Sequence, residues 1–266
     1  MENLCRRIGM PEEVTKLLLS WQPEEELDLS PLTREETWES GMKEIKAHLG
    51  DDPRGLKILW CMLQCALDAK PKFQELGLSD EIYYDTMACL SRFVGEYRNI
   101  HDEYGFNLET WAVRQISCKL FRIGQLEYEL LQRNGENWIS LHIPTDILLR
   151  QPLLRQSYLQ ARQAIAKAFP EYADAPMYCR SWIMSPILEE FLPSQSNIVT
   201  FHRSFTIEPS PMDSIDFLEW VTKRPVGPFE ELPEETTLQR KLKAYLLSGK
   251  TYYYGMGILK PDPFLE

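Results

Sequence analysis

The sequence predicts an α/β (α+β) protein in which a helical N-terminal region precedes a mixed β-sheet flanked by helices. Three observations predict this class. Apolar residues recur at helical spacing through the first 124 residues. At Leu126–Leu130 the spacing changes to strict alternation, which is typical of a half-buried strand. Residues 138–207 then alternate strand, helix, strand, helix and strand, as βαβ units do.

The first 124 residues predict helices and no strand. The expected helices cover residues 11–21, 33–49, 54–68, 79–104 and 107–123. Thr33, followed by Glu36 three residues later, fits a capping box and should begin the second helix. Pro71 should stop the third helix, and Gly105 should cap the end of the fourth.

The remainder of the chain predicts the sheet. Strands are expected at 126–130, 138–143, 177–184, 205–207 and 252–259, and helices at 152–168, 186–192, 213–222 and 237–247. Asn134-Gly135 between the first two strands indicates a β-hairpin. Gly255 and Gly257 in the last strand indicate a bulge or a close approach of another backbone. We therefore divide the chain into a helical domain at residues 1–124 and an α/β domain at residues 125–266.

Composition limits the classes of partner. The net charge is -11 and the pI is about 5.0, so the surface repels phosphate backbones and anionic lipid headgroups. We expect neither nucleic acid nor a membrane as partner, while a local basic cleft for a small anion remains compatible with this charge. No apolar run approaches the length of about 20 residues that spans a bilayer. The N-terminus shows no apolar signal segment, so we expect a cytoplasmic protein.

Metal and nucleotide motifs are weak in this sequence. Cys61 and Cys65 stand one helical turn apart and could hold a metal with ligands from elsewhere. Since no second cysteine pair or nearby histidine accompanies them, we favour two small buried apolar side chains. The four histidines are scattered, so no metal site is expected. Between Gly135 and Gly227 the chain has no glycine, which excludes a glycine-rich phosphate loop there.

Two polar residues at strand ends are the first candidates for chemistry. His142 could be a general base, because histidine titrates near neutrality. It could also be a structural residue bonded to a loop carbonyl, and the sequence alone favours this second interpretation. Ser181 lacks the Gly-x-Ser-x-Gly context of a serine hydrolase, so it more plausibly bonds a backbone group or a ligand. Trp182 next to it would line a wall or belong to the core.

Two further polar residues lie between the last predicted helices and strands. Asn197 near a helix start could be an N-cap, which is the favoured interpretation. His202, followed by Arg203, could simply be solvated.

Several spaced motifs resemble a family of bacterial proteins. They are Leu141-His142-Ile143-Pro144, a helix with Ser157 and Ala161, Cys179-x-Ser181-Trp182-Ile183-Met184-x-Pro186, Ser196-Asn197-Ile198-x-x-Phe201-x-x-x-Phe205, and the closing Gly255-Met256-Gly257-Ile258-Leu259. This pattern resembles the GNAT-like C-terminal domain of acyltransferases. The helical first half is similar to the N-terminal domain that accompanies it, so the resemblance spans nearly the whole chain.

The resemblance implies a sheet whose central strands part to hold an acyl-CoA co-substrate. The strand at 138–144 would polarise the thioester carbonyl through its backbone near Ile143, and the helix that starts near Gln151-Pro152 would bind the pyrophosphate. The sequence departs from the usual glycine-containing loop at this point. Arg150 and Arg155 could replace the missing backbone contacts as charged donors, or they could be surface residues.

The resemblance also implies roles for the candidate residues. GNAT enzymes commonly place a tyrosine acid before the penultimate strand, and residues 197–205 contain none. His142 is then the first candidate to deprotonate a small amine or hydroxyl acceptor. Ser181 and Asn197 would orient the acceptor, Trp182 would wall the site, and His202 would contact the substrate.

Two other functions fit the sequence. The missing glycine loop and tyrosine also fit a catalytically degenerate scaffold that binds a small metabolite. The tryptophans of the helical half could instead form a surface for a protein partner, although tryptophans at helical spacing are more often core.

Overall fold

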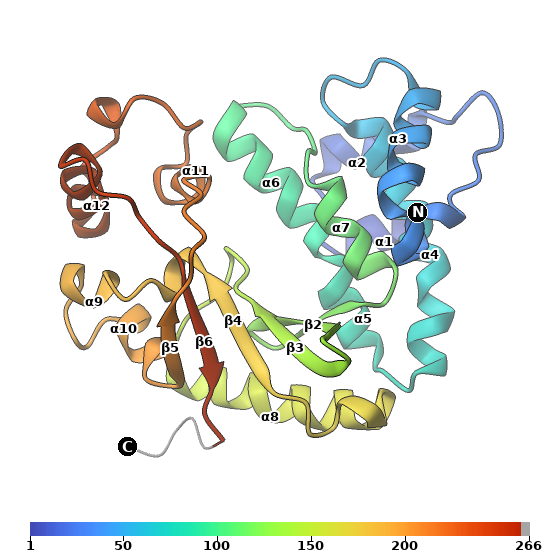
Figure 1. The fold of residues 1–266 in the computed structure, drawn as a ribbon. Helices are drawn as coiled ribbons and strands as arrows, with labels where there is room; N and C mark the ends of the chain where they lie inside the picture. The colour runs from blue at the N-terminus through green and yellow to red at the C-terminus, as the bar shows by residue number, and fades with distance from the viewer. Residues whose placement is uncertain (262–266) are drawn as a thin grey trace. The chain divides into compact units, whose positions relative to one another are not determined.

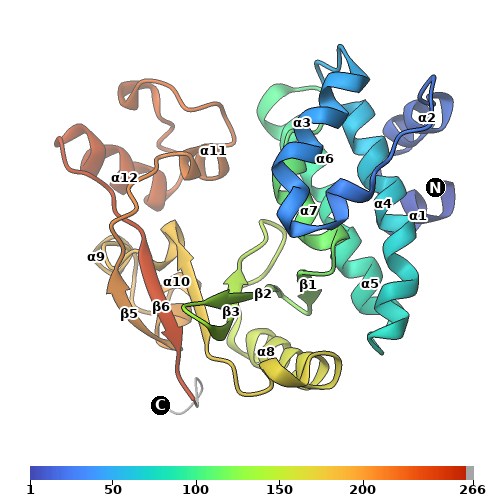
Figure 2. The ribbon, with the colours of Figure 1, turned by 45° about the vertical axis from the view of Figure 1, so that its right-hand side comes forward.

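The structure, a computed structural model, describes residues 1–261 and forms two compact units (Figures 1 and 2). The first unit comprises Met1–Ile123 together with Lys167–Phe169. The second comprises Gly124–Ala166 and the described residues from Pro170 onward. The predicted fold class, helices followed by a mixed sheet with helices, is confirmed. In the described part of the chain, every helix is too short or too polar to cross a bilayer.

The first unit is helical and ends in a short strand. Its elements are α1 (Glu2–Arg7), α2 (Glu12–Ser20), the 3-10 turns η1 (Ser30–Thr33) and η2 (Glu35–Thr37), α3 (Trp38–Leu49), α4 (Leu56–Glu75), α5 (Asp80–Met87), α6 (Cys89–His101), α7 (Glu109–Ile116) and β1 (Leu120–Ile123). The long helix α4 has nine buried residues. Phe73 at its C-terminal end packs edge-on against Tyr83 and Phe121, with centroids 5.3 and 5.4 Å away.

The predicted capping box at Thr33 is wrong. Thr33 closes the turn η1, where its hydroxyl donates to Ser30 O at 2.9 Å, and α3 begins only at Trp38. Pro31 lies against Gly41 so closely that a Cβ at Gly41 would overlap the proline ring. This contact holds the segment before α3 in tight turns, which a local capping pattern does not reveal.

The predicted helix stop at Pro71 is also wrong, because α4 continues through the proline to Glu75. An interior proline removes one helical hydrogen bond. The buried packing of Phe73 offsets that loss, and the chain turns away only at Gly77, whose φ is +68°.

The expected helix at 79–104 is two helices, α5 and α6, joined at Ala88. Ser79 caps the first of them as a serine should, accepting a bond from Ile82 N at 3.2 Å. The second ends at His101, where Asp102 adopts a left-handed conformation, so the predicted cap at Gly105 is wrong.

The expected helix at 107–123 is also divided. It consists of α7 followed by β1, so the expectation of no strand before residue 126 is wrong.

The second unit holds five strands in the order β2-β3-β4-β6-β5. Its elements are β2 (Leu126–Arg133), β3 (Glu136–His142), α8 (Gln151–Ala168), η3 (Pro170–Tyr172), β4 (Met177–Ser181), η4 (Trp182–Met184), α9 (Leu188–Phe191), α10 (Asn197–His202), β5 (Phe205–Pro209), α11 (Phe217–Thr222), η5 (Phe229–Glu231), α12 (Thr237–Leu247) and β6 (Gly255–Leu259). β3 and β4 are parallel, and the other neighbouring pairs in this order are antiparallel. The predicted hairpin is confirmed as β2–β3.

One face of the β2–β3 hairpin is the core face and packs on α8. Tyr128 and Leu141 lie opposite each other in the register and are fully buried. Buried Ser157 of α8 lies 2.8 Å from the Tyr128 hydroxyl and accepts a bond from Leu126 N at 3.3 Å. Burial raises the pKa of the Tyr128 phenol, so the group stays neutral and serves as a structural hydrogen-bonding group.

The predicted strand at 177–184 is shorter than expected. β4 ends at Ser181, and Trp182–Met184 form the 3-10 turn η4. The close approach expected at the β6 glycines is confirmed, because a Cβ at Gly255 would overlap the carbonyl oxygen of Met184. Gly255 therefore allows η4 to cross directly over β6. Near the C-terminus, α11 starts later than predicted, at Phe217, and the strand starts at Gly255.

We predict that Gly255→Ala destabilises the protein by about 2–3 kcal/mol, because the new methyl group meets backbone that cannot rotate away. Urea unfolding followed by tryptophan fluorescence measures this. Gly227→Ala is the control, since no atom lies within 4 Å of its ideal Cβ, and it should change stability by less than about 0.5 kcal/mol. Equal stability of the two variants would contradict the proposed crossing.

Candidate functional site

The two central parallel strands part from each other partway along their length. β3 and β4 pair at Ile139↔Met177 and Ser140↔Tyr178. Both strands continue beyond these pairs, but β3 then follows β2 to His142 and β4 follows β6 to Ser181. In Figures 1 and 2 the β2–β3 hairpin is accordingly angled away from the β4–β6 pair. The backbone groups on the facing edges of β3 and β4 lie outside the β3–β4 ladder, and such groups need other partners.

His142 is the last residue of β3, at the point where the strands part. Its Nε2 donates a hydrogen bond to Glu129 Oε2 at 2.8 Å, and the two side chains are 21% and 18% exposed. Glu129 lies on β2 opposite Ser140, so the pair is diagonal across the hairpin.

Glu129 is the residue that sequence reasoning missed. The alternation Glu127-Tyr128-Glu129 indicated that both acids share the face opposite Tyr128. The register places Glu127 directly opposite His142 and Glu129 opposite Ser140, and the hydrogen bond shows that the diagonal acid, Glu129, contacts the histidine.

Ser181 and His142 lie on opposite faces of the sheet. Ser140 and Tyr178 are register partners, and side chains alternate along each strand, so His142 shares their face and Ser181 does not. The Ser181 hydroxyl accepts a bond from Ile183 N at 3.3 Å and caps η4.

Trp182 packs against a hydrophobic cluster built by the segment between β5 and β6. Its ring stacks on Phe217 with centroids 5.0 Å apart, and its carbonyl accepts a bond from Tyr252. The cluster comprises Phe217, Leu218, Leu232, Leu242, Leu246, Tyr252 and Tyr254.

Asn197 and His202 are both on α10. The N-cap is Ser196, which accepts a bond from Val199 N, so the expected cap at Asn197 is wrong, and Asn197 is exposed. The expectation that His202 is solvated is wrong too, since it is only 2% exposed. Its Nε2 donates to Ile183 O at 2.7 Å, and its Nδ1 lies 3.1 Å from Glu189 Oε1.

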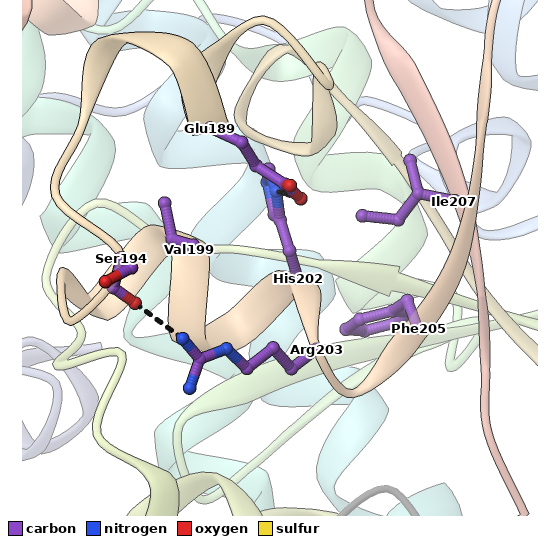
Figure 3. A pocket seen from close by; sticks show the side chains of 7 residues that line it. All are labelled: Glu189, Ser194, Val199, His202, Arg203, Phe205 and Ile207. Carbon is purple, nitrogen blue, oxygen red and sulfur yellow. Dashed lines mark hydrogen bonds and ion pairs between the residues drawn. The ribbon is translucent and has the colours of Figure 1, made fainter.

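His202 borders a pocket of about 440 Å³ between α9, α10 and β5 (Figure 3). The pocket is lined by Glu189, Ser194, Val199, His202, Arg203, Phe205 and Ile207. Figure 3 shows Glu189 beside His202, and Arg203 bonded to the Ser194 carbonyl. Both ring nitrogens of His202 are thus already engaged.

The start of α8 is short of backbone donors. Pro152 has no N–H, and the N–H groups of Leu153 and Leu154 donate to Arg150 O at 3.0 Å. Arg150, directly before α8, and Arg155, near the start of the helix, have exposed side chains. Any anion held here would depend on these guanidinium groups more than on backbone N–H groups.

The six cysteines are buried and reduced. Burial raises the pKa of Cys61, Cys65 and Cys179 to about 12, so these thiols stay protonated and unreactive. The interpretation of Cys61 and Cys65 as small buried side chains is confirmed. The described part of the chain contains no group of His, Cys, Asp or Glu side chains arranged to hold a metal ion.

A mixed sheet whose central parallel strands part, and whose first parallel strand leads into a helix, defines a GNAT-like domain. Family models agree with this class. Residues 120–259 match the GNAT-like C-terminal domain, and residues 1–118 match the N-acyltransferase N-terminal domain. The chain belongs to this two-domain GNAT-like N-acyltransferase family, as its motifs predicted. A search of curated protein sequences finds no significant match.

Solved structures share the fold. One is an acyltransferase in complex with decanoyl-CoA and teicoplanin, with a TM-score of 0.80 and 24% sequence identity over 97% of this chain and 86% of the other. A mutant acyltransferase in complex with octanoyl-CoA matches with a TM-score of 0.80 and 23% sequence identity, over 97% of this chain and 86% of the other. A complex with CoA and 10C-teicoplanin matches with a TM-score of 0.80 and 24% identity over 97% and 86%.

Proposed function

We propose that this protein transfers an acyl group from acyl-CoA to an amine of a small-molecule acceptor. The observation that carries the proposal is the parting of β3 and β4 beside His142. Membership of an N-acyltransferase family supports it, as do the acyl-CoA complexes of proteins with this fold. The length of the acyl chain and the identity of the amine stay open.

In this proposal the pantetheine arm lies between β3 and β4. The backbone near Ile143, where β3 has separated from β4, provides hydrogen bonds to the arm and to the thioester carbonyl. Donors fixed in a strand need no rearrangement when negative charge develops on that oxygen. Arg150 and Arg155, at the start of the helix that follows, meet the phosphates of CoA.

His142 takes a proton from the acceptor in this proposal. The amine nitrogen attacks the thioester carbon, the new C–N bond forms, and the C–S bond breaks to release CoA. His142 removes the proton that the attacking nitrogen must lose. Direct transfer is favoured over an acyl-enzyme intermediate, since Cys179 is protonated at neutral pH and the Ser181 hydroxyl already caps η4.

For the remaining candidates we propose supporting roles. Ser181 and Trp182 fix the crossing of η4 over β6, which holds the end of β4 in place. His202 holds α10 to the turn η4 through Ile183. Asn197, exposed at the start of α10, would contact a bound acceptor.

His142→Ala should lower kcat by about 100- to 10,000-fold, the usual contribution of general base catalysis. Thiol release from decanoyl-CoA, with a panel of amino sugars, amino-acid amides and glycopeptides as acceptors, measures the rate. Calorimetry should show unchanged acyl-CoA affinity in the variant. Full activity of His142→Ala would exclude it as the base, and failure of the wild type to bind any acyl-CoA from acetyl to dodecanoyl would exclude the function.

Arg150→Gln and Arg155→Gln should each weaken acyl-CoA binding about tenfold, which corresponds to about 1.4 kcal/mol. Calorimetry with decanoyl-CoA measures the change, and decanoyl-pantetheine, which lacks the phosphates, should bind the variants and the wild type equally. Arg240→Gln, an exposed arginine of α12 that bonds Glu234 O, serves as the control and should bind as the wild type does. Equal loss for the phosphate-free thioester would contradict the assignment.

A further inference from the structure

Arg180 lies beside the opening between β3 and β4, and the proposed function does not yet use it. It is on β4, two residues after Tyr178, which pairs with Ser140 of β3. His142 is two residues after Ser140, so Arg180 and His142 hold corresponding positions on the two sides of the opening. Since side chains alternate between the faces of a strand, both residues lie on the same face of the sheet.

The guanidinium group of Arg180 is exposed and has no charged partner. Within residues 1–261, its side chain makes no hydrogen bond, ion pair or ring contact. Met256 of β6 lies directly opposite it, and Glu208 of β5 lies opposite Met256. This acid is two strands away, about 10 Å between backbones, and no ion pair joins it to Arg180 in that range. The chain has 40 acidic and 29 basic residues, so a shortage of acids does not explain the unpaired arginine.

Arg133 shows the contrasting arrangement on the same face of the sheet. Its guanidinium carbon lies 5.5 Å from the ring centroid of Trp138 and 5.0 Å from that of Tyr178. The two rings pack edge-on against each other, with centroids 5.8 Å apart, and Tyr178 is buried. The charge of Arg133 is thus engaged by two aromatic rings. This cluster covers the part of the face where β3 and β4 still pair, while Arg180 lies beyond it.

We propose that Arg180 binds a carboxylate of the acceptor, so that the acceptor is an amine that also carries a carboxylate group. The inference rests on the proposed function, because it concerns the acceptor of the same reaction. A guanidinium group binds a carboxylate through two parallel N–H···O bonds, which fix its orientation as well as its position. With the carboxylate held on the β4 side of the opening, the amine of the same molecule extends toward the thioester. Holding the reacting nitrogen there accelerates its attack on the thioester carbon.

The sheet separates Arg180 from the groups proposed to bind CoA phosphates. The helix α8 packs on the face that carries Tyr128 and Leu141, and Arg180 lies on the opposite face. Arg150 and Arg155, which are proposed to meet the phosphates, belong to the start of α8. Arg180 is therefore assigned to the acceptor and not to the CoA moiety.

The test compares acceptors that differ only in the carboxylate, with decanoyl-CoA as the donor. The matched pairs are ε-aminocaproate with ε-aminocaproamide, and phenylalanine with phenylalaninamide. Arg180→Gln should lower kcat/KM for the carboxylate-bearing acceptor about 10- to 100-fold, the usual worth of a hydrogen bond between charged groups. It should leave kcat/KM for the amide within about twofold, and calorimetry should show unchanged affinity for decanoyl-CoA.

Two further variants and a control separate recognition of charge from folding. Arg180→Glu should reverse the preference, so that cadaverine, which has an ammonium group at the far end, becomes a better acceptor than ε-aminocaproate. Arg180→Lys keeps the charge but loses the planar fork, so its rate should lie between those of the wild type and Arg180→Gln. Arg240→Gln, on α12, should behave as the wild type does. Because Arg180 is exposed, urea unfolding should give the same midpoint for all of these proteins.

Each outcome bears on a different claim. If Arg180→Gln lowers the rate equally for the carboxylate and the amide, or weakens binding of decanoyl-CoA, the assignment of Arg180 is wrong and the proposed function stands. If the wild type transfers the acyl group only to amines without a carboxylate, the inference is again overturned. If the wild type binds no acyl-CoA, the proposed function fails, and the role of Arg180 fails with it.

Discussion

The proposed site depends on one constraint, namely that β3 and β4 pair over a short stretch only, from the middle of β3 to the start of β4. Each strand keeps its outer neighbour after the two part, β2 for β3 and β6 for β4. The strands therefore remain regular although the sheet between them opens. Backbone N–H and C=O groups are strong hydrogen-bonding groups, and they need hydrogen-bond partners. An extended molecule with amide groups of its own, such as a pantetheine arm, satisfies them as a missing strand would.

The rest of the second unit stabilises this open arrangement. On the β3 side, the buried contact between Tyr128 and Ser157 joins the hairpin to α8. On the β4 side, Ser181 ends the strand and η4 crosses β6 at Gly255, where no side chain is tolerated. Both halves of the sheet are thus anchored through their outer faces and ends. The polar face with His142 and Glu129 is consequently held by a core in which neither residue takes part.

Regular periodicity in the sequence predicted most of the second unit. The helix at 152–168 and the helix at 237–247 agree closely with α8 and α12, because strong amphipathic patterns and clear stops define them. Local rules failed where tertiary packing overrides them. Pro71 does not end α4, since buried Phe73 lies beyond it, and β1 was missed because its four residues are too few to show a period.

The candidate site could be predicted only in part for a related reason. His142 was found because a histidine at a strand end is conspicuous in a sequence. Glu129 was not, because its partner is 13 residues away and the pairing depends on the register of the hairpin. Ser181 shows the reverse case, since its neighbours in sequence suggested chemistry while its hydroxyl caps the next turn. The face of the sheet that a residue occupies, and the residue that lies across from it on the next strand, are determined by the tertiary structure.

The most direct test of the central claim is a crystal structure of the protein with decanoyl-CoA bound. We predict that the pantetheine amides hydrogen-bond to the backbone of β3 between Leu141 and Ile143, with the thioester within reach of His142. Acyl-CoA bound elsewhere, or β3 and β4 paired without interruption up to His142 and Ser181, would contradict the account.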